Sequence, residues 1–128
     1  MYKTIDIEGK PVEFLSNAAT PRVYQATFHK DILREFSNLD KDELGSDEAL
    51  EAAEMIKRLA FIMNIQATKP FREYYGKLTD ADYVEWLSQY EDDTLFDKDL
   101  LLQIVGVWKK NAKTSIEPKN QASPQSES

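Results

Sequence analysis

Residues 46–67, "SDEALEAAEMIKRLAFIMNIQA", have the pattern of a long helix. Ser46 is suited to cap the helix N-terminus, and the two acids that follow it are stabilised by the positive end of the helix dipole. Pro70 disfavours helical geometry in the residue before it and so ends the helix. We therefore expect a helix at about 47–67.

This predicted helix carries more apolar side chains than one buried face requires. At 100° per residue, its main apolar face gathers Ala49, Ala52, Ala53, Met55, Ile56, Leu59, Ala60, Ile62, Met63 and Ala67. Phe61 and Ile65 lie on the other side. The second half of the helix is therefore apolar nearly all round.

A later predicted helix, at about 95–111, has the same excess. Seven of its apolar residues fill about half the circumference, although a helix packed on one core needs a stripe of only about 100°. Leu95 and Leu102 fall outside even this arc. Either neighbouring elements of the same fold cover the wide arc, or another chain does. Because both helices show the excess, we favour a surface that another chain completes. The seven residues are Phe96, Leu100, Leu101, Ile104, Val105, Val107 and Trp108.

The N-terminal segment has the alternating pattern of a β-hairpin. Pairing Ile7 with Val12 and Ile5 with Phe14 places all four apolar side chains on one face. Pro11 has no N–H to close a tight turn, which favours a four-residue loop. Because two strands alone are marginally stable in water, this face must pack on helices of the chain or on a neighbour.

The remaining stretches complete the predicted fold. Residues 16–27 contain Pro21 and are predicted to be irregular, and residues 69–78 are predicted to form a linker. Residues 112–128 have no aromatic residue and are rich in Ser, Pro, Gln, Lys and Glu, which predicts a disordered tail. The fold class is therefore mainly α with an N-terminal β-hairpin (α+β), with about four helices in a small bundle. The predicted domain, residues 1–111, contains a hairpin at 2–15 and helices at about 28–39, 47–67, 80–90 and 95–111.

Composition narrows the classes of partner. The 128 residues carry 23 acids and 16 bases, and the formal charge of −7 repels phosphate backbones and anionic membranes. We therefore predict a protein partner, with no nucleic acid and no membrane. The absence of cysteine suits a reducing cytosol, and no apolar run approaches the roughly 20 residues of a membrane-spanning helix. These features favour a cytoplasmic protein.

No catalytic, metal-binding or cofactor-binding motif passes a spacing test. His29 is the only histidine, so a zinc site or a Ser-His triad would depend on it, yet no cysteine or second histidine accompanies it. An EF-hand loop counted from Asp92 would need Gly and Glu where Asp97 and Gln103 stand. The four glycines are scattered and form no phosphate-binding loop. An enzyme is therefore the poorest of the function classes, and we predict no cofactor.

The segment "KPFREYYGK", residues 69–77, is the best candidate for nucleic-acid binding. It interleaves three basic with three aromatic residues, as a platform for stacked bases would. A short basic segment on an acidic protein is more often a packed linker. We interpret it as a packed linker.

Three stretches of the chain occur in a characteristic order. They are "IDIEGKPVEFLSNAATPRVYQATFHKDIL" at 5–33, "LAFIMNIQA" at 59–67 and "EWLSQY" at 85–90, and a final apolar helix follows them. In this order they resemble the tail assembly chaperones of long-tailed, siphovirus-type phages that infect Gram-positive bacteria. The resemblance extends over about residues 2–111 and includes no catalytic signature.

The resemblance implies a non-enzymatic assembly factor in the cytoplasm of the bacterial host, absent from the mature virion. Such a chaperone binds the very long tape-measure protein and keeps its apolar helices from aggregating. Neighbouring copies along this client would associate with one another. These families usually also make a longer product by ribosomal frameshifting, whose added domain recruits the tail-tube protein. Codons for Lys109, Lys110 and Asn111 can form a slippery heptamer, and Lys119 with Asn120 offers a second place for one.

Six residues are predicted to contact the partner. They are selected by their positions on helical wheels, and aromatic residues among them are favoured at binding hot spots. Trp108 is alternatively a core residue. Two other classes of protein remain open: a small structural head-tail joining protein of the virion, and a cytosolic helical adaptor domain. The six predicted contact residues are Phe61, Ile65, Trp86, Tyr90, Leu102 and Trp108.

Overall fold

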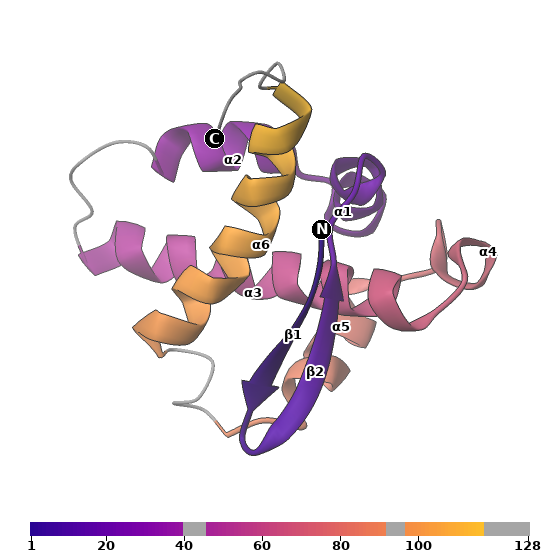
Figure 1. Ribbon diagram of the computed structural model, residues 1–128, viewed down its shortest axis with the longest axis horizontal. Helices are drawn as coiled ribbons and strands as arrows, with labels where there is room; N and C mark the ends of the chain where they lie inside the picture. The colour runs from indigo at the N-terminus through magenta and orange to yellow at the C-terminus, as the bar shows by residue number, and fades with distance from the viewer. Residues whose placement is uncertain (40–45, 92–96, 117–128) are drawn as a thin grey trace, which may run out of the picture.

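The chain folds into a mainly helical structure with an N-terminal antiparallel β-hairpin, which confirms the predicted fold class. The computed structural model describes residues 1–39, 46–91 and 97–116. Within them the chain forms six helices instead of about four (Figure 1). In chain order the elements are β1 (Tyr2–Ile7), β2 (Lys10–Leu15), α1 (Thr20–Phe28), α2 (Ile32–Leu39), α3 (Ser46–Thr68), α4 (Phe71–Tyr74), α5 (Asp80–Leu87) and α6 (Lys98–Ile116).

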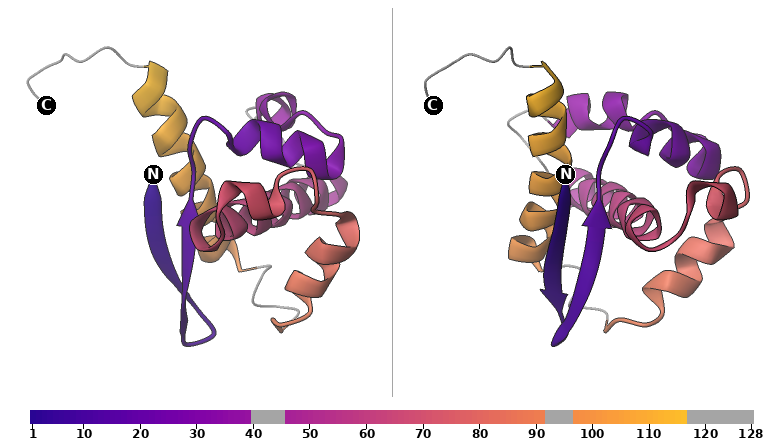
Figure 2. Two further views of the ribbon diagram at one scale, coloured as in Figure 1. Left: turned by 90° about the vertical axis from the view of Figure 1, so that its right-hand side faces the viewer. Right: turned by 45° about the vertical axis from the view of Figure 1, so that its right-hand side comes forward.

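Helix α3 lies at the centre of the molecule and spans the predicted 47–67 with one more residue at each end (Figures 1 and 2). It contacts β2, α1, α2, α5 and α6. Because these elements surround it, the apolar side chains of its second half are buried on all sides of the helix. They are Met55, Ile56, Leu59, Ala60, Phe61, Ile62, Met63 and Ile65.

The hairpin forms where it is predicted, but its register is shifted by two residues. Ile5 lies opposite Val12, and Ile7 lies opposite Lys10. Glu8 and Gly9 form a two-residue turn, and both have positive φ, 55° and 79°. Positive φ at both positions is what the favoured two-residue hairpin turn requires. The expected four-residue loop is therefore wrong.

Pro11 permits this tight turn because it is not needed as a donor in the observed register. It lies opposite Asp6, next to the pair that closes the turn. Hydrogen-bonded and non-hydrogen-bonded pairs alternate along an antiparallel ladder, so the missing N–H removes no ladder bond. A shift of two residues also keeps each side chain on its predicted face. Ile5, Ile7 and Phe14 are accordingly buried on one face.

Helix α1 lies in the segment predicted to be irregular, so that prediction is wrong. Pro21 stands in the first turn of α1, where the missing N–H has no intrahelical partner in any case. His29 ends α1 in the left-handed conformation with φ 59°, and its N–H donates to the carbonyl of Gln25 at 2.8 Å. The helix predicted at 28–39 therefore begins only at Ile32.

Helix α5 begins with a capping box formed by Thr79 and Asp82. The hydroxyl of Thr79 accepts the N–H of Asp82 at 3.3 Å, and the Asp82 carboxylate accepts the N–H of Thr79 at 2.9 Å. The helix ends at Leu87, before the predicted end at 90. Just upstream, α4 forms a single turn within the segment predicted to be a linker.

The last helix, α6, begins and ends later than predicted. It begins at Lys98 rather than 95 and continues to Ile116 rather than 111. Leu95, and residues 117–128 of the predicted tail, lie outside the described residues.

A polar network ties three helices to α3. Arg58 of α3 donates from Nε to the Tyr24 hydroxyl of α1 at 3.0 Å, and its guanidinium lies 3.4 Å from the Glu35 carboxylate of α2. The Tyr24 hydroxyl in turn donates to Glu35 at 2.7 Å. The network extends to α5, because the Tyr83 hydroxyl donates to Glu54 at 2.6 Å and the Glu54 carboxylate lies 3.9 Å from the Arg58 guanidinium. These contacts set the positions of α1, α2 and α5 around α3.

The charges of this network change the ionisation of Glu54. Partial burial alone would raise the pKa of its carboxyl group, but the Tyr83 hydrogen bond and the cations Lys57 and Arg58 bring that pKa below its ordinary value of 4.5. Burial and the neighbouring Glu54 charge raise the pKa of Tyr83. Tyr83 therefore stays protonated and remains a hydrogen-bond donor.

We expect this network to make stability depend on pH. Because the folded-state pKa of Glu54 is lowered, its contribution is complete above the unfolded-state pKa and is lost as the pH falls through the folded-state value. The substitution Glu54→Gln should lower the free energy of unfolding at neutral pH by no more than about 1 kcal/mol, since the side chain is 42% exposed. The difference should disappear in acid.

Urea unfolding between about pH 7 and about pH 3 measures this difference. Glu85→Gln, which removes an exposed carboxylate of α5, is the matched control. A loss of stability from Glu54→Gln that persists undiminished at the acid end would contradict the assignment.

Candidate functional site

Metal chemistry finds no support in the side chains that the structure describes. In residues 1–39, 46–91 and 97–116, no group of three or more His, Cys, Asp or Glu could hold a metal ion. The six predicted contact residues lie in the core, beside a surface hollow and on an exposed helix face.

Phe61 and Ile65 belong to the core, which corrects the interpretation that they are left over for a partner. Phe61 is 1% exposed, and its ring lies 5.7 Å from each of the rings of Tyr83 and Trp86 on α5. Phe28 of α1 packs against it at 6.3 Å. Ile65 is also buried. The apolar excess of α3 is thus covered by its own chain.

Trp86 and Tyr90 lie side by side near the end of α5, with their ring centroids 5.3 Å apart. Trp86 is buried, and its indole N–H donates to the side-chain oxygen of Asn64 at 3.0 Å. Tyr90 is half-buried. Burial and the charge of Glu8 raise the pKa of Tyr90. Of this pair, only Tyr90 offers surface to a partner.

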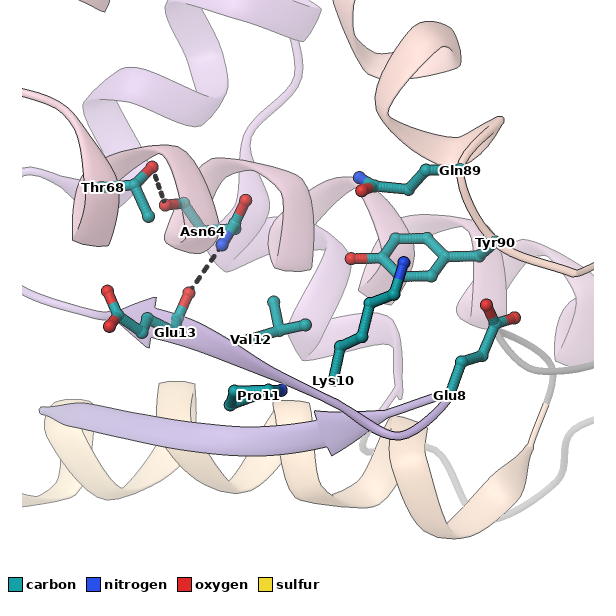
Figure 3. Close-up of a pocket in the computed structure, with 9 residues that line it drawn as sticks. All are labelled: Glu8, Lys10, Pro11, Val12, Glu13, Asn64, Thr68, Gln89 and Tyr90. Atoms are coloured by element: carbon teal, nitrogen blue, oxygen red, sulfur yellow. Dashed lines mark hydrogen bonds between the residues drawn. The ribbon is translucent and has the colours of Figure 1, made fainter.

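Tyr90 lines a hollow of about 390 Å³ between β2, α3 and the end of α5 (Figure 3). The Asn64 amide donates to the Glu13 carbonyl at 2.8 Å, and the Thr68 hydroxyl donates to the Asn64 carbonyl at 2.9 Å. The lining carries charges of both signs and few apolar groups, unlike the mostly apolar pockets that hold small molecules. The lining residues are Glu8, Lys10, Pro11, Val12, Glu13, Asn64, Thr68, Gln89 and Tyr90.

Helix α6 separates its apolar side chains into a buried and an exposed set. Trp108 is 5% exposed and stacks on Phe36 of α2, with ring centroids 5.7 Å apart and planes at 22°. The core alternative for Trp108 is thereby confirmed. Leu102 points the other way and is 57% exposed. The buried set is Leu100, Ile104, Val107 and Trp108.

Leu102 is the most exposed member of an apolar surface that we name the α6 strip, formed by Leu101, Leu102 and Val105. Leu101 and Val105 are half-buried, and residues three or four apart on a helix are neighbours on its surface. Gly106 is exposed beside the strip, and a Cβ atom there would meet nothing within 4 Å. The helix backbone is therefore open to close approach at this point. The α6 strip is the part of the predicted contact surface that the structure leaves uncovered.

The sequence reasoning missed other exposed apolar side chains. Leu33 of α2 and Val84 of α5 are more than half exposed, and Phe71 and Tyr75 of the segment 69–77 are exposed as well. The spacing of Leu33 and Val84 suits their helices' buried faces, so no periodic signal separates them from core residues. For Phe71 and Tyr75, the mixture of aromatic and basic residues in 69–77 was the sequence feature that could have indicated their exposure.

Comparison with protein-family models, curated proteins and solved structures finds no match to this chain. Among its described helices, none has both the length and the apolar character needed to cross a bilayer.

Trp108 and Leu102 should respond in opposite ways to truncation. Trp108→Ala empties a buried position and should lower the free energy of unfolding by about 3–5 kcal/mol. Leu102→Ala removes an exposed side chain and should change it by less than about 0.5 kcal/mol. Urea unfolding followed by circular dichroism measures both. Equal losses from the two variants would contradict the division of α6 into a buried and an exposed face.

Proposed function

We propose that this chain is a non-enzymatic tail assembly chaperone, which binds the tape-measure protein of a phage and keeps it soluble in the cytoplasm of the bacterial host. The α6 strip, with Leu102 57% exposed, is the observation that carries the proposal. The resemblance of residues 2–111 to such chaperones supports it. On this proposal the protein is not part of the mature virion.

The α6 strip suits an apolar face of a client helix. Leu102 meets the client side chains, and Gly106 allows the two backbones to approach. The four buried members of the predicted set support the strip indirectly, since Phe61, Trp86 and Ile65 build the core and Trp108 holds α6 on α2. Tyr90, half-buried, is a secondary contact residue.

Binding through so small a surface is weak and reversible. If a client helix covers a few hundred square ångströms, burial at about 25 cal/mol per Å² yields several kcal/mol before the cost of association is subtracted. Many copies along one elongated client, touching their neighbours, make coverage cooperative. A longer frameshifted product among these copies would bring the tail-tube protein to the client, and arriving tube subunits would displace the chaperone.

Co-expression with the open reading frame immediately downstream tests the proposal. The downstream product should be insoluble alone, and soluble and co-purified with this chain. Leu102→Asp places a charge in the α6 strip and should abolish both effects while leaving the thermal unfolding midpoint of the chain unchanged. Val84→Asp is the matched control, because Val84 is similarly exposed, at 54%, on α5; it should keep the client soluble.

Two outcomes would count against the proposal. The first is a client that stays soluble without this chain, or that is solubilised equally by wild type and Leu102→Asp. The second is the presence of this chain in purified virions by mass spectrometry, which would indicate a structural head-tail joining protein instead.

A further inference from the structure

The segment 69–77 forms a projection at one end of the molecule. It follows the C-terminal end of α3 and lies at the end of the long axis opposite the start of α3 (Figures 1 and 2). We name its exposed side chains the α4 knob: Lys69, Phe71, Arg72, Tyr75 and Lys77.

The two aromatic rings of the α4 knob form an exposed stack. Phe71 is 48% and Tyr75 is 37% exposed, and their ring centroids lie 4.8 Å apart with the planes at 18°. Parallel rings at this distance are in the offset-stacked range. The outer faces of this stack can accept another flat or apolar side chain.

Tyr74 anchors the knob, so the stack is held in place by the core. Its ring is 4% exposed, and its hydroxyl accepts a hydrogen bond from the buried Gln66 amide at 3.5 Å. The backbone adds a bond from the Lys77 N–H to the Tyr74 carbonyl at 2.9 Å, and Gly76 supplies the positive φ of 77° that this turn requires. The knob is therefore a formed surface rather than a frayed helix end.

The cations around the stack have no ionic partner in the described part of the chain. Lys69, Arg72 and Lys77 are exposed, and none lies within salt-bridge distance of a described carboxylate. With Glu73, the segment carries a formal charge of +2, whereas the rest of the chain carries −9, since the whole carries −7. The knob is a local positive site on a negative protein.

We propose that the α4 knob binds a short acidic peptide that carries an aromatic or aliphatic side chain. The apolar side chain stacks on Phe71 and Tyr75, and a neighbouring carboxylate pairs with Arg72, whose planar guanidinium binds carboxylates through two hydrogen bonds. Lys69 and Lys77 attract further acids of the peptide. This site lies on a different element from the α6 strip and does not depend on the proposed chaperone function.

A short peptide fits the charge distribution better than a nucleic acid or an anionic membrane. At physiological ionic strength, charges are screened beyond about 8 Å, so a peptide confined to the knob meets mainly its positive charge. A long polyanion or an anionic membrane surface extends beyond the knob. It is repelled by the remaining residues, whose formal net charge is −9.

Fluorescence anisotropy with the full chain tests this site. The probe is a short fluorescein-labelled peptide of alternating Glu and Phe, and the comparison peptide has Gln in place of each Glu. Wild type should bind the Glu peptide at least about tenfold more tightly than the Gln peptide, with an affinity that falls as salt is added. Arg72→Glu should weaken binding of the Glu peptide about tenfold or more, and Phe71→Ala should weaken binding of both peptides.

Arg34→Glu is the matched control, because Arg34 is an exposed arginine of α2 outside the knob; it should leave binding unchanged. Lys77→Glu serves as a second charge reversal, and circular dichroism establishes that each variant is folded. Equal binding of the two peptides, or equal losses from Arg72→Glu and Arg34→Glu, would overturn the proposal. Tighter binding of single-stranded oligo-dT or of phosphatidylserine vesicles than of the Glu peptide would overturn it as well.

Discussion

The structure depends on the enclosure of α3 by the rest of its own chain. The second half of α3 is apolar nearly all round, and such a segment is stable only when other elements cover every side; α3 contacts five elements. Complete burial of one large apolar side chain contributes about 1.5–3 kcal/mol, and Leu59, Phe61, Ile62 and Met63 are all at most 1% exposed. The two-stranded hairpin and the short helices α1 and α5 are too small to be stable alone. They gain their stability from this helix.

Three polar side chains of α3, those of Arg58, Asn64 and Gln66, determine which neighbour lies where. Apolar burial is not directional, so it does not by itself set the order of elements around α3. Asn64 donates to a carbonyl of β2 and accepts from Trp86 of α5, and Gln66 accepts from Thr20 of α1 and donates to Tyr74 of α4. Arg58 donates to Tyr24 of α1 and forms an ion pair with Glu35 of α2. A neighbour placed elsewhere would leave these groups without partners, which costs more than a hydrogen bond gains.

The sequence predicts the elements of this fold better than their arrangement. Periodicity shows that Phe61 lies on the second face of α3, but it does not show that Tyr83 and Trp86 fold back onto that face. The excess of apolar side chains on α3 therefore suggested a partner chain, whereas α5 of the same chain covers them. The predictions of an irregular segment around Pro21 and of a four-residue hairpin loop beside Pro11 were wrong for a related reason. The effect of a proline depends on whether a backbone N–H is needed at that position. Among the predicted contact residues, only Leu102 could be recognised as exposed from the helical wheel alone. Its position on the wheel is about opposite the buried face of α6.

The closed core constrains how this protein can bind anything. Because the large side chains of α3 are already covered, a partner gains affinity only from side chains outside the core, such as those of the α6 strip and the α4 knob. Contact at the α6 strip leaves α6 in place, since the opposite face of that helix holds it through Trp108 on Phe36. Binding then requires no unfolding and costs little conformational entropy. A surface that is preformed but small binds and releases quickly, and that property suits the proposed function, in which the chain covers a client and is later displaced.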